Sequence, residues 1–150
     1  GEALSCIYHG WSYARTGDCL RIPAHPGLTP PETIRTVTYP VAEADGVIWV
    51  AAGEPANAPP ALVDLVPLRS MTALAGIAAI ESAAGAKAGD EGLIDGNGIH
   101  LLLSSRRDGE TLIHVLVPAD AGPDARIAAA RTAEGLRRRA EALQKKEAAQ

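Results

Sequence analysis

The chain has 150 residues, of which 47% are hydrophobic and 21% are charged, and its formal net charge is −4. This composition excludes a chain that is disordered throughout, and it suffices for one globular domain or two small ones. The acidic balance disfavours non-specific binding to nucleic acid or to an anionic membrane, because both require a basic protein surface. The uncharged apolar run Met71–Ile80 is far shorter than the about 20 residues that cross a bilayer, so we expect no membrane span.

Cysteine usage and the N-terminus bear on the compartment. Two cysteines are too few for a disulfide framework, and the chain does not open with the charged and apolar segments of a secretory signal. We therefore expect a cytoplasmic protein. The sequence opens at Gly1 and its only methionine is Met71, so we expect it to be a piece of a longer chain.

Residues 1–52 predict an antiparallel all-β unit, because short β-branched and aromatic runs alternate there with Gly, Asp and Pro. The turn signals Thr16–Asp18 and Asp45-Gly46 separate neighbouring runs. The expected strands are Ala3–Cys6, Trp11–Ala14, Leu20–Ile22, Thr33–Tyr39 and Gly46–Ala52. The proline-rich residues 53–60 lose this periodicity, which predicts an extended linker and a domain boundary.

Residues 61–150 predict a small α+β unit. The expected elements are a strand at Arg69–Leu74, a helix at Ile77–Lys87, and a hairpin of Ile99–Ser104 and Leu112–Val117 that turns through Arg107–Glu110 with Asp-Gly at its centre. A final helix is expected at Ala125–Leu143, because Ala129, Ala133, Leu136, Ala140 and Leu143 form one apolar stripe. Neither a two-stranded hairpin nor a narrow helix stripe is stable alone, so we expect the two to pack together.

The motif that carries chemistry is Cys6-Ile7-Tyr8-His9-Gly10-Trp11. A thiol and an imidazole three positions apart, where a strand passes into a loop, can turn toward one metal, and a glycine lets the backbone approach it. The pair supplies two ligands, whereas a zinc or iron–sulfur site needs four. No second pair with ligand spacing follows downstream, so the motif alone is half of a metal site.

This motif, with Tyr13, Gly17 and Ile22-Pro23 after it, resembles the second ligand loop of a Rieske [2Fe-2S] domain in the large subunit of Rieske non-haem iron oxygenases. The resemblance continues through Tyr39–Val41 and Asp45–Val50 to the linker. It implies that Cys6 and His9 are cluster ligands, with backbone N–H groups around Gly10 and Trp11 bonded to the cluster sulfurs. Ile7 stands where the family usually has proline, a departure that affects no ligand.

The resemblance also shows what this sequence lacks. In the family each of two loops gives one cysteine and one histidine, and the first loop would precede Gly1. Cys19 and His25 do not replace it, because Cys19 follows a turn within a strand and His25 lies in a loop between Ala24 and Pro26. We interpret Cys19 as a small core residue and His25 as a surface residue.

The family's second metal is a mononuclear Fe(II) held by two histidines and a carboxylate. Its usual signature does not occur in residues 61–150, where the histidines are His100 and His114. If Asp108-Gly109 forms a two-residue turn, His100 faces Val117 and His114 faces Leu103, so that the imidazoles point to opposite sides of the sheet. A single bulge would bring them together. We interpret both as structural or solvent-facing, assign no catalytic residue, and expect the mononuclear iron in intact relatives only.

The fold class that follows is an all-β Rieske-like half domain and then a small α+β unit resembling the end of the oxygenase catalytic domain. That second resemblance rests on Gly98–Pro118 and the helix after it, as in the vanillate O-demethylase-like branch of the family. The iron-bearing middle of that domain is not recognisable in this sequence.

The resemblance implies the Rieske electron-transfer portion of an aromatic-compound oxygenase, hydroxylating or O-demethylating, that passes electrons from a reductase or ferredoxin to a mononuclear iron. Two alternatives stay open: a free-standing Rieske electron carrier, and a non-enzymatic remnant that binds a ligand or self-associates. Whether this chain is an enzyme also stays open, because neither the Fe(II) triad nor the first cluster loop is visible. Assembly into a homo-oligomer also stays open.

Overall fold

A computed structural model describes residues 2–106 and 109–149. It divides into two compact units. The N-terminal unit comprises Gly1–Ala42 and Trp49–Ala58, and the C-terminal unit comprises Glu43–Ile48 and Pro59–Gln150. Residues 53–60 carry no helix or strand. None of the helices in the described ranges is both long and apolar enough to cross a membrane.

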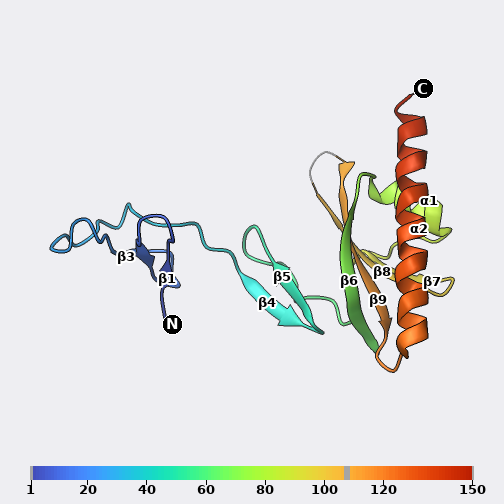
Figure 1. The fold of residues 1–150 in the computed structure, drawn as a ribbon, viewed down its shortest axis with the longest axis horizontal. Coiled ribbons are helices and arrows are strands. Elements are labelled where there is room, and N and C mark those ends of the chain that lie inside the picture. The colour runs from blue at the N-terminus through green and yellow to red at the C-terminus, as the bar shows by residue number, and fades with distance from the viewer. Residues whose placement is uncertain (1, 107–108, 150) are drawn as a thin grey trace. The chain divides into compact units, whose positions relative to one another are not determined.

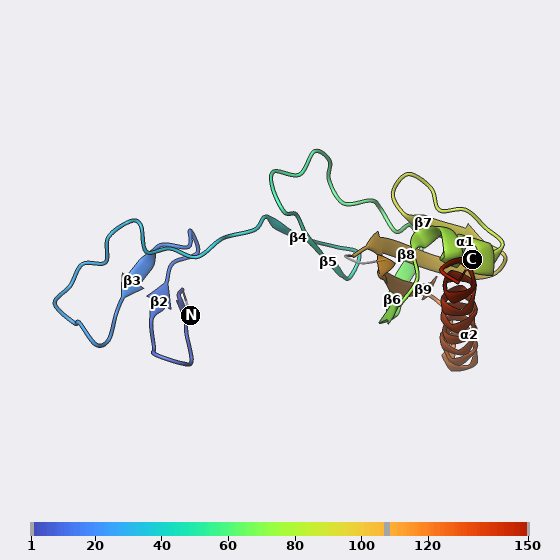
Figure 2. The ribbon, with the colours of Figure 1, turned by 90° about the horizontal axis from the view of Figure 1, so that it is seen from above.

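Three short antiparallel strands form the sheet of the N-terminal unit: β1 (Leu4–Ser5), β2 (Ser12–Tyr13) and β3 (Cys19–Arg21) (Figures 1 and 2). The turn between β2 and β3 depends on Gly17, whose φ is 89°. A Cβ at this position would lie 2.5 Å from the carbonyl oxygen of Thr36, so only glycine fits. The predicted turn at Thr16–Asp18 is therefore confirmed.

The predicted strand at Thr33–Tyr39 is wrong. The backbone of this segment forms one isolated bridge, between Asp18 and Arg35, whose two bonds are Cys19 N to Ile34 O at 3.0 Å and Thr36 N to Gly17 O at 2.8 Å. Prolines at both ends of the segment, at 30, 31 and 40, remove the donors that a longer ladder would need.

A strand that the sequence analysis missed, β4 (Val41–Ala44), pairs with β5 (Val47–Val50). The turn between them has Asp45 at φ 51° and Gly46 at φ 75°, which confirms the predicted Asp-Gly hairpin turn. The tip of this hairpin belongs to the C-terminal unit, where Asp45 Oδ2 accepts a hydrogen bond from the backbone N–H of Leu62 at 2.8 Å.

The C-terminal unit is a four-stranded antiparallel sheet in the order β6-β9-β8-β7, with two helices. Its elements are β6 (Leu65–Ala73), α1 (Ile77–Ala84), β7 (Leu93–Gly96), β8 (Ile99–Ser105), β9 (Thr111–Pro118) and α2 (Pro123–Glu147). Figures 1 and 2 show α2 lying along one face of the sheet with α1 beside it. The expected fold class, a small antiparallel β unit followed by an α+β unit, is confirmed.

The core of this unit lies between α2 and the β8–β9 hairpin. The buried cluster joins Leu136 and its neighbours on α2 to inward-facing residues of β8 and β9; those members are Ala133, Leu136, Ala140, Leu101, Leu103, Ile113 and Val115. The hairpin and the final helix therefore pack together, as their apolar patterns predicted.

Two side chains of α2 also position α1. Gln144 Oε1 accepts the backbone N–H of Gly76, and Glu141 Oε1 accepts that of Leu74, each at 3.0 Å. Gly76 is the N-cap of α1 and has no side chain of its own to satisfy a helix donor. The helix ends where Gly85 adopts φ 66°, which is three residues before the end expected from the sequence.

Candidate cluster-ligand loop and an apolar pocket

The Cys6–Trp11 motif forms a closed turn between β1 and β2. The backbone N–H of Cys6 donates to the carbonyl oxygen of Trp11, and the N–H of Gly10 donates to the carbonyl oxygen of Cys6, each at 2.8 Å. Gly10 has φ 69°, and a Cβ there would lie 3.3 Å from Pro23 Cγ. The glycine thus permits the reversal that brings Cys6 and His9 into one short loop.

The loop faces solvent. Cys6 and His9 are both exposed, and the side chains of Ile7 and Tyr8 between them are 105% and 82% exposed. The Tyr8 and His9 rings meet edge to face with their centroids 4.0 Å apart, which gives the His9 imidazole a neighbour on one side.

Gly10 and Trp11, around which N–H groups are expected to bond the cluster sulfurs, have different roles in this turn. The Gly10 amide donates to Cys6 O and so serves the turn. Trp11 is half-buried and contributes its carbonyl oxygen to the same turn. In this structure the Gly10 N–H is bonded to the backbone, and a bond from N–H groups around Gly10 and Trp11 to the cluster sulfurs stays a prediction.

Cys6 and His9 are the two types of ligand that a Rieske cluster takes, and they supply two of its four protein ligands. Such a cluster takes two cysteines and two histidines, and this loop offers Cys6 and His9. Within residues 2–106 and 109–149 no group of three or more Cys, His, Asp or Glu side chains is placed to hold a metal ion. Cys19 is 8% exposed and His25 is exposed, which confirms their interpretation as a core and a surface residue.

The histidines of the second unit lie on the same face of the sheet, and the prediction of opposite faces is wrong. His100 pairs with Leu116 and His114 with Leu102, so the strands are offset by one residue from the two-residue-turn register. Arg106 N donates to Glu110 O at 2.9 Å and Gly109 has φ 72°, which indicates a longer loop. Arg107 and Asp108 of the predicted turn lie outside the described residues.

Each of these histidines has its own cross-strand partner. His100 Nδ1 lies 2.8 Å from Asp95 Oδ1, and His114 Nδ1 lies 2.7 Å from Ser70 Oγ. Partial burial lowers the pKa of His114, so its neutral form is favoured. Both imidazoles are thus used in pairs that join neighbouring strands, which agrees with the structural interpretation.

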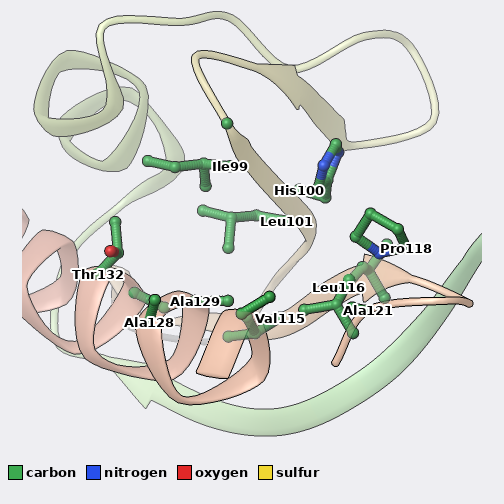
Figure 3. A pocket seen from close by; sticks show the side chains of 14 residues that line it. Ile99, His100, Leu101, Val115, Leu116, Pro118, Ala121, Ala128, Ala129 and Thr132 are labelled. Carbon is green, nitrogen blue, oxygen red and sulfur yellow. The ribbon is translucent and has the colours of Figure 1, made fainter. Parts of the chain in front are cut away.

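An apolar pocket of about 320 Å³ lies between the N-terminal half of α2 and β8–β9. Figure 3 shows Ile99 and Leu101 directed toward Ala128 and Ala129 of the helix, with His100 on the other side of the strand beside Pro118. This pocket was not among the features predicted from the sequence. Its signal is the run of small residues on α2, since side chains as short as alanine leave space over the sheet; the lining residues of α2 are Ala125, Ala128, Ala129, Thr132 and Ala133.

Solved structures with a similar fold come from Pseudomonas putida CBB5. NdmA with caffeine superposes with a TM-score of 0.61 at 15% sequence identity, over 91% of this chain and 62% of the NdmA chain. The NdmA QL mutant with theobromine gives a TM-score of 0.60 at 15% identity, over 91% and 61% of the two chains. At this level of identity the likeness shows the fold.

Curated relatives match a shorter stretch. The chain is 43% identical to oxidoreductase NdmD of Pseudomonas putida over 65 residues, which cover 43% of this chain and 11% of NdmD. Two further proteins are each 35% identical to this chain over 60 residues. These residues cover 40% of this chain and 17% of each of the two proteins. These are the toluene-4-sulfonate monooxygenase system iron-sulfur subunit TsaM1 of Comamonas testosteroni and the oxygenase component of dicamba O-demethylase of Stenotrophomonas maltophilia. The matches span less than a fifth of these relatives.

A family model described as the Rieske [2Fe-2S] domain matches residues 1–40, a range that contains the whole Cys6–Trp11 loop. The family expected from the motif is therefore supported by an independent match over the same residues. Residues 1–40 match a Rieske [2Fe-2S] domain, and a stretch of 60 residues is similar to the iron-sulfur subunit of a monooxygenase system and to the oxygenase component of a demethylase.

Proposed function

We propose that this chain contributes a Rieske electron-transfer centre to an aromatic-compound oxygenase, with Cys6 and His9 as two of the four protein ligands of the cluster. The observation that carries the proposal is the closed turn that presents both donors within the stretch matching the Rieske domain. When bound, such a cluster transfers one electron at a time at a potential of roughly −150 to +300 mV.

In this proposal Cys6 binds as a thiolate and His9 as a neutral imidazole, so the loop releases protons when it takes up the cluster. The left-handed Gly10 holds the two donors in one turn, and Tyr8 restricts the His9 ring. The exposed Ile7 and Tyr8 form the surface over which the segment with the remaining cysteine and histidine packs.

The apolar pocket supports an aromatic substrate as the target of the oxygenase, because a flat apolar molecule matches its alanine and branched aliphatic lining. A finer proposal places the chain in the vanillate O-demethylase-like branch, with a reductase or ferredoxin as electron donor and a homo-oligomer in the cytoplasm. The mononuclear iron of such an oxygenase is assigned to no residue of this chain.

The pocket also favours a second candidate, a module that binds an apolar ligand without redox chemistry. Iron and acid-labile sulfide content separates the two functions. We expect the 150 residues alone to retain fewer than two irons per chain after reconstitution, since half of the ligand set leaves half of the iron coordination unfilled. We also expect them to show no oxygenase turnover of an aromatic ether when a reductase is supplied.

The protein expressed from its complete reading frame is the decisive sample. We expect two irons and two sulfides per chain, with loss of both in Cys6→Ser and in His9→Ala. Cys19→Ala and His25→Ala are the matched controls, because they remove the same kinds of side chain outside the loop. A complete protein without iron or sulfide would overturn the proposal and favour the apolar-ligand module.

A further inference from the structure

A second hollow, of about 370 Å³, lies on the surface of the C-terminal unit where α2 passes β6. It is open to solvent and is separate from the apolar pocket. Four of its six lining residues are charged; the lining consists of Arg69 on β6 and of Ala130, Arg131, Glu134, Gly135 and Arg138 on α2.

The backbone explains why these groups meet. The register of β6 shifts between Pro67 and Arg69, after which Arg69 pairs with Val115. Val115 belongs to the core cluster beneath α2, and directly paired residues share a face of the sheet, so Arg69 lies on the helix side. On α2, Arg131 and Arg138 are two turns apart on one helix face.

The charges of the hollow are unbalanced. Its lining holds three guanidinium groups and one carboxylate, Glu134. That carboxylate is already engaged, because Glu134 Oε1 accepts from Arg138 at 2.9 Å and from Arg137 at 2.8 Å. Among the described residues, the side chains of Arg69 and Arg131 have neither a hydrogen bond nor an ion pair.

One lining residue of the hollow, Gly135, is a glycine for which packing gives no reason. Glycine in the middle of a helix is less favourable than alanine. A Cβ built on Gly135 meets Arg139 Nη1 at 3.6 Å, an ordinary contact, so alanine would fit there. The missing side chain instead leaves the space between Arg131 and Arg138 open.

We propose that this hollow binds a small oxyanion of the phosphate class, held by Arg69 from the sheet and Arg131 from the helix. Guanidinium groups present forked N–H donors that match phosphate oxygens and keep their charge at all physiological pH values. Arg138, fixed by its bond to Glu134, contributes the third positive group at the rim. The ligand is either free phosphate or the phosphoryl group of a small organic molecule. The site contains no residue of the Cys6–Trp11 loop, so the phosphate-binding proposal does not depend on the proposed electron transfer.

The test is a titration of the ¹⁵N-labelled 150-residue chain with inorganic phosphate, with sodium chloride adjusted to constant ionic strength. We expect saturable shifts of the Gly135 amide and of the Arg69 and Arg131 side-chain Nε–H signals. Glycerol 3-phosphate is titrated in parallel. Binding at least tenfold tighter than that of phosphate identifies an organic phosphoryl group as the source, and equal or weaker binding identifies free phosphate.

The double variant Arg69→Gln/Arg131→Gln should weaken phosphate binding at least tenfold, while circular dichroism shows that α2 is retained. The matched control is Arg15→Gln/Arg21→Gln, which removes the same charge from exposed positions of the N-terminal unit and should leave binding unchanged. Shifts that rise linearly without saturation, or an equal loss in both double variants, would overturn the proposal.

Discussion

The backbone N–H of Cys6 donates to the carbonyl oxygen of Trp11 at 2.8 Å, so the first and last residues of the motif close one turn. Within that turn the N–H of Gly10 is bonded back to Cys6 O, which requires the left-handed conformation of the glycine. The geometry of the two candidate ligands therefore depends on residue 10 as directly as on the donors themselves.

Substitution of Gly10 by alanine tests this dependence. Residue 10 has the left-handed backbone conformation, with φ 69°, which an L side chain rarely adopts. A Cβ there would also lie 3.3 Å from Pro23 Cγ. We expect Gly10→Ala to lower the stability of the N-terminal unit by about 1 to 2 kcal/mol, measured by chemical denaturation. Gly27→Ala is the control, because a Cβ there meets nothing within 4 Å, and its effect should stay within about 0.5 kcal/mol. Equal effects would contradict the strained-turn account.

The packing of α2 on the hairpin predicts a large effect at Leu136, which is fully buried in the core cluster. Leu136→Asp should cost on the order of 2 to 4 kcal/mol, because it places an unpaired charge among apolar side chains. Thermal unfolding followed by circular dichroism measures the loss. Ile127→Asp, on the same helix at a position that is 50% exposed, should cost far less. An unchanged midpoint in Leu136→Asp would mean that the helix is detached from the sheet.

Thr111 supplies a buried polar contact between β9 and the segment before α1. Its hydroxyl donates to the carbonyl oxygen of Ala75 at 2.8 Å, and both residues are 0% exposed. Thr111→Val should cost about 1 to 3 kcal/mol, since the Ala75 oxygen would stay buried without a donor. Thr132→Val, at an exposed position of α2, is the control and should change the unfolding free energy by less than about 0.5 kcal/mol.

The decrease in stability at acidic pH tests the hydrogen bonds of Glu134. Hydrogen bonds from Arg137 and then Arg138 lower the pKa of Glu134 to about 2. Because an unfolded glutamate titrates near about 4.3, the folded state gains stability above that pH and loses it as the pH falls toward about 2. We expect the difference in Tm between the wild type and Glu134→Gln to shrink over this window. Glu147→Gln is the control, because Glu147 takes no part in these bonds. If its difference in Tm from the wild type shrank in the same way, the pH dependence would not be due to Glu134.

Some of this fold could be read from local signals. The Asp45-Gly46 turn, the β8–β9 hairpin and the α2 stripe all have patterns in which the residues decide the conformation by themselves. Asn97-Gly98, with φ values of 55° and 71°, is another such turn, and it joins β7 to β8. Its signal in the sequence is weak, because the strand before it, Leu93–Gly96, has only four residues and ends in glycine.

Other features depend on tertiary context. The offset that places His100 and His114 on one face is set by a longer loop, and a change of one residue in loop length reverses every side chain of a strand. The apolar pocket depends on how closely α2 approaches the sheet, which alanines leave undetermined. The Cys6–His9 pair was recognisable because both ligands lie within one short motif.

Electron paramagnetic resonance of the dithionite-reduced protein, expressed from its complete reading frame, tests the central claim most directly. The account predicts a Rieske-type signal in the wild type, in Cys19→Ala and in His25→Ala, and no such signal in Cys6→Ser or His9→Ala. A Rieske-type signal that persists in either Cys6→Ser or His9→Ala would show that this loop does not hold the cluster and would contradict the account.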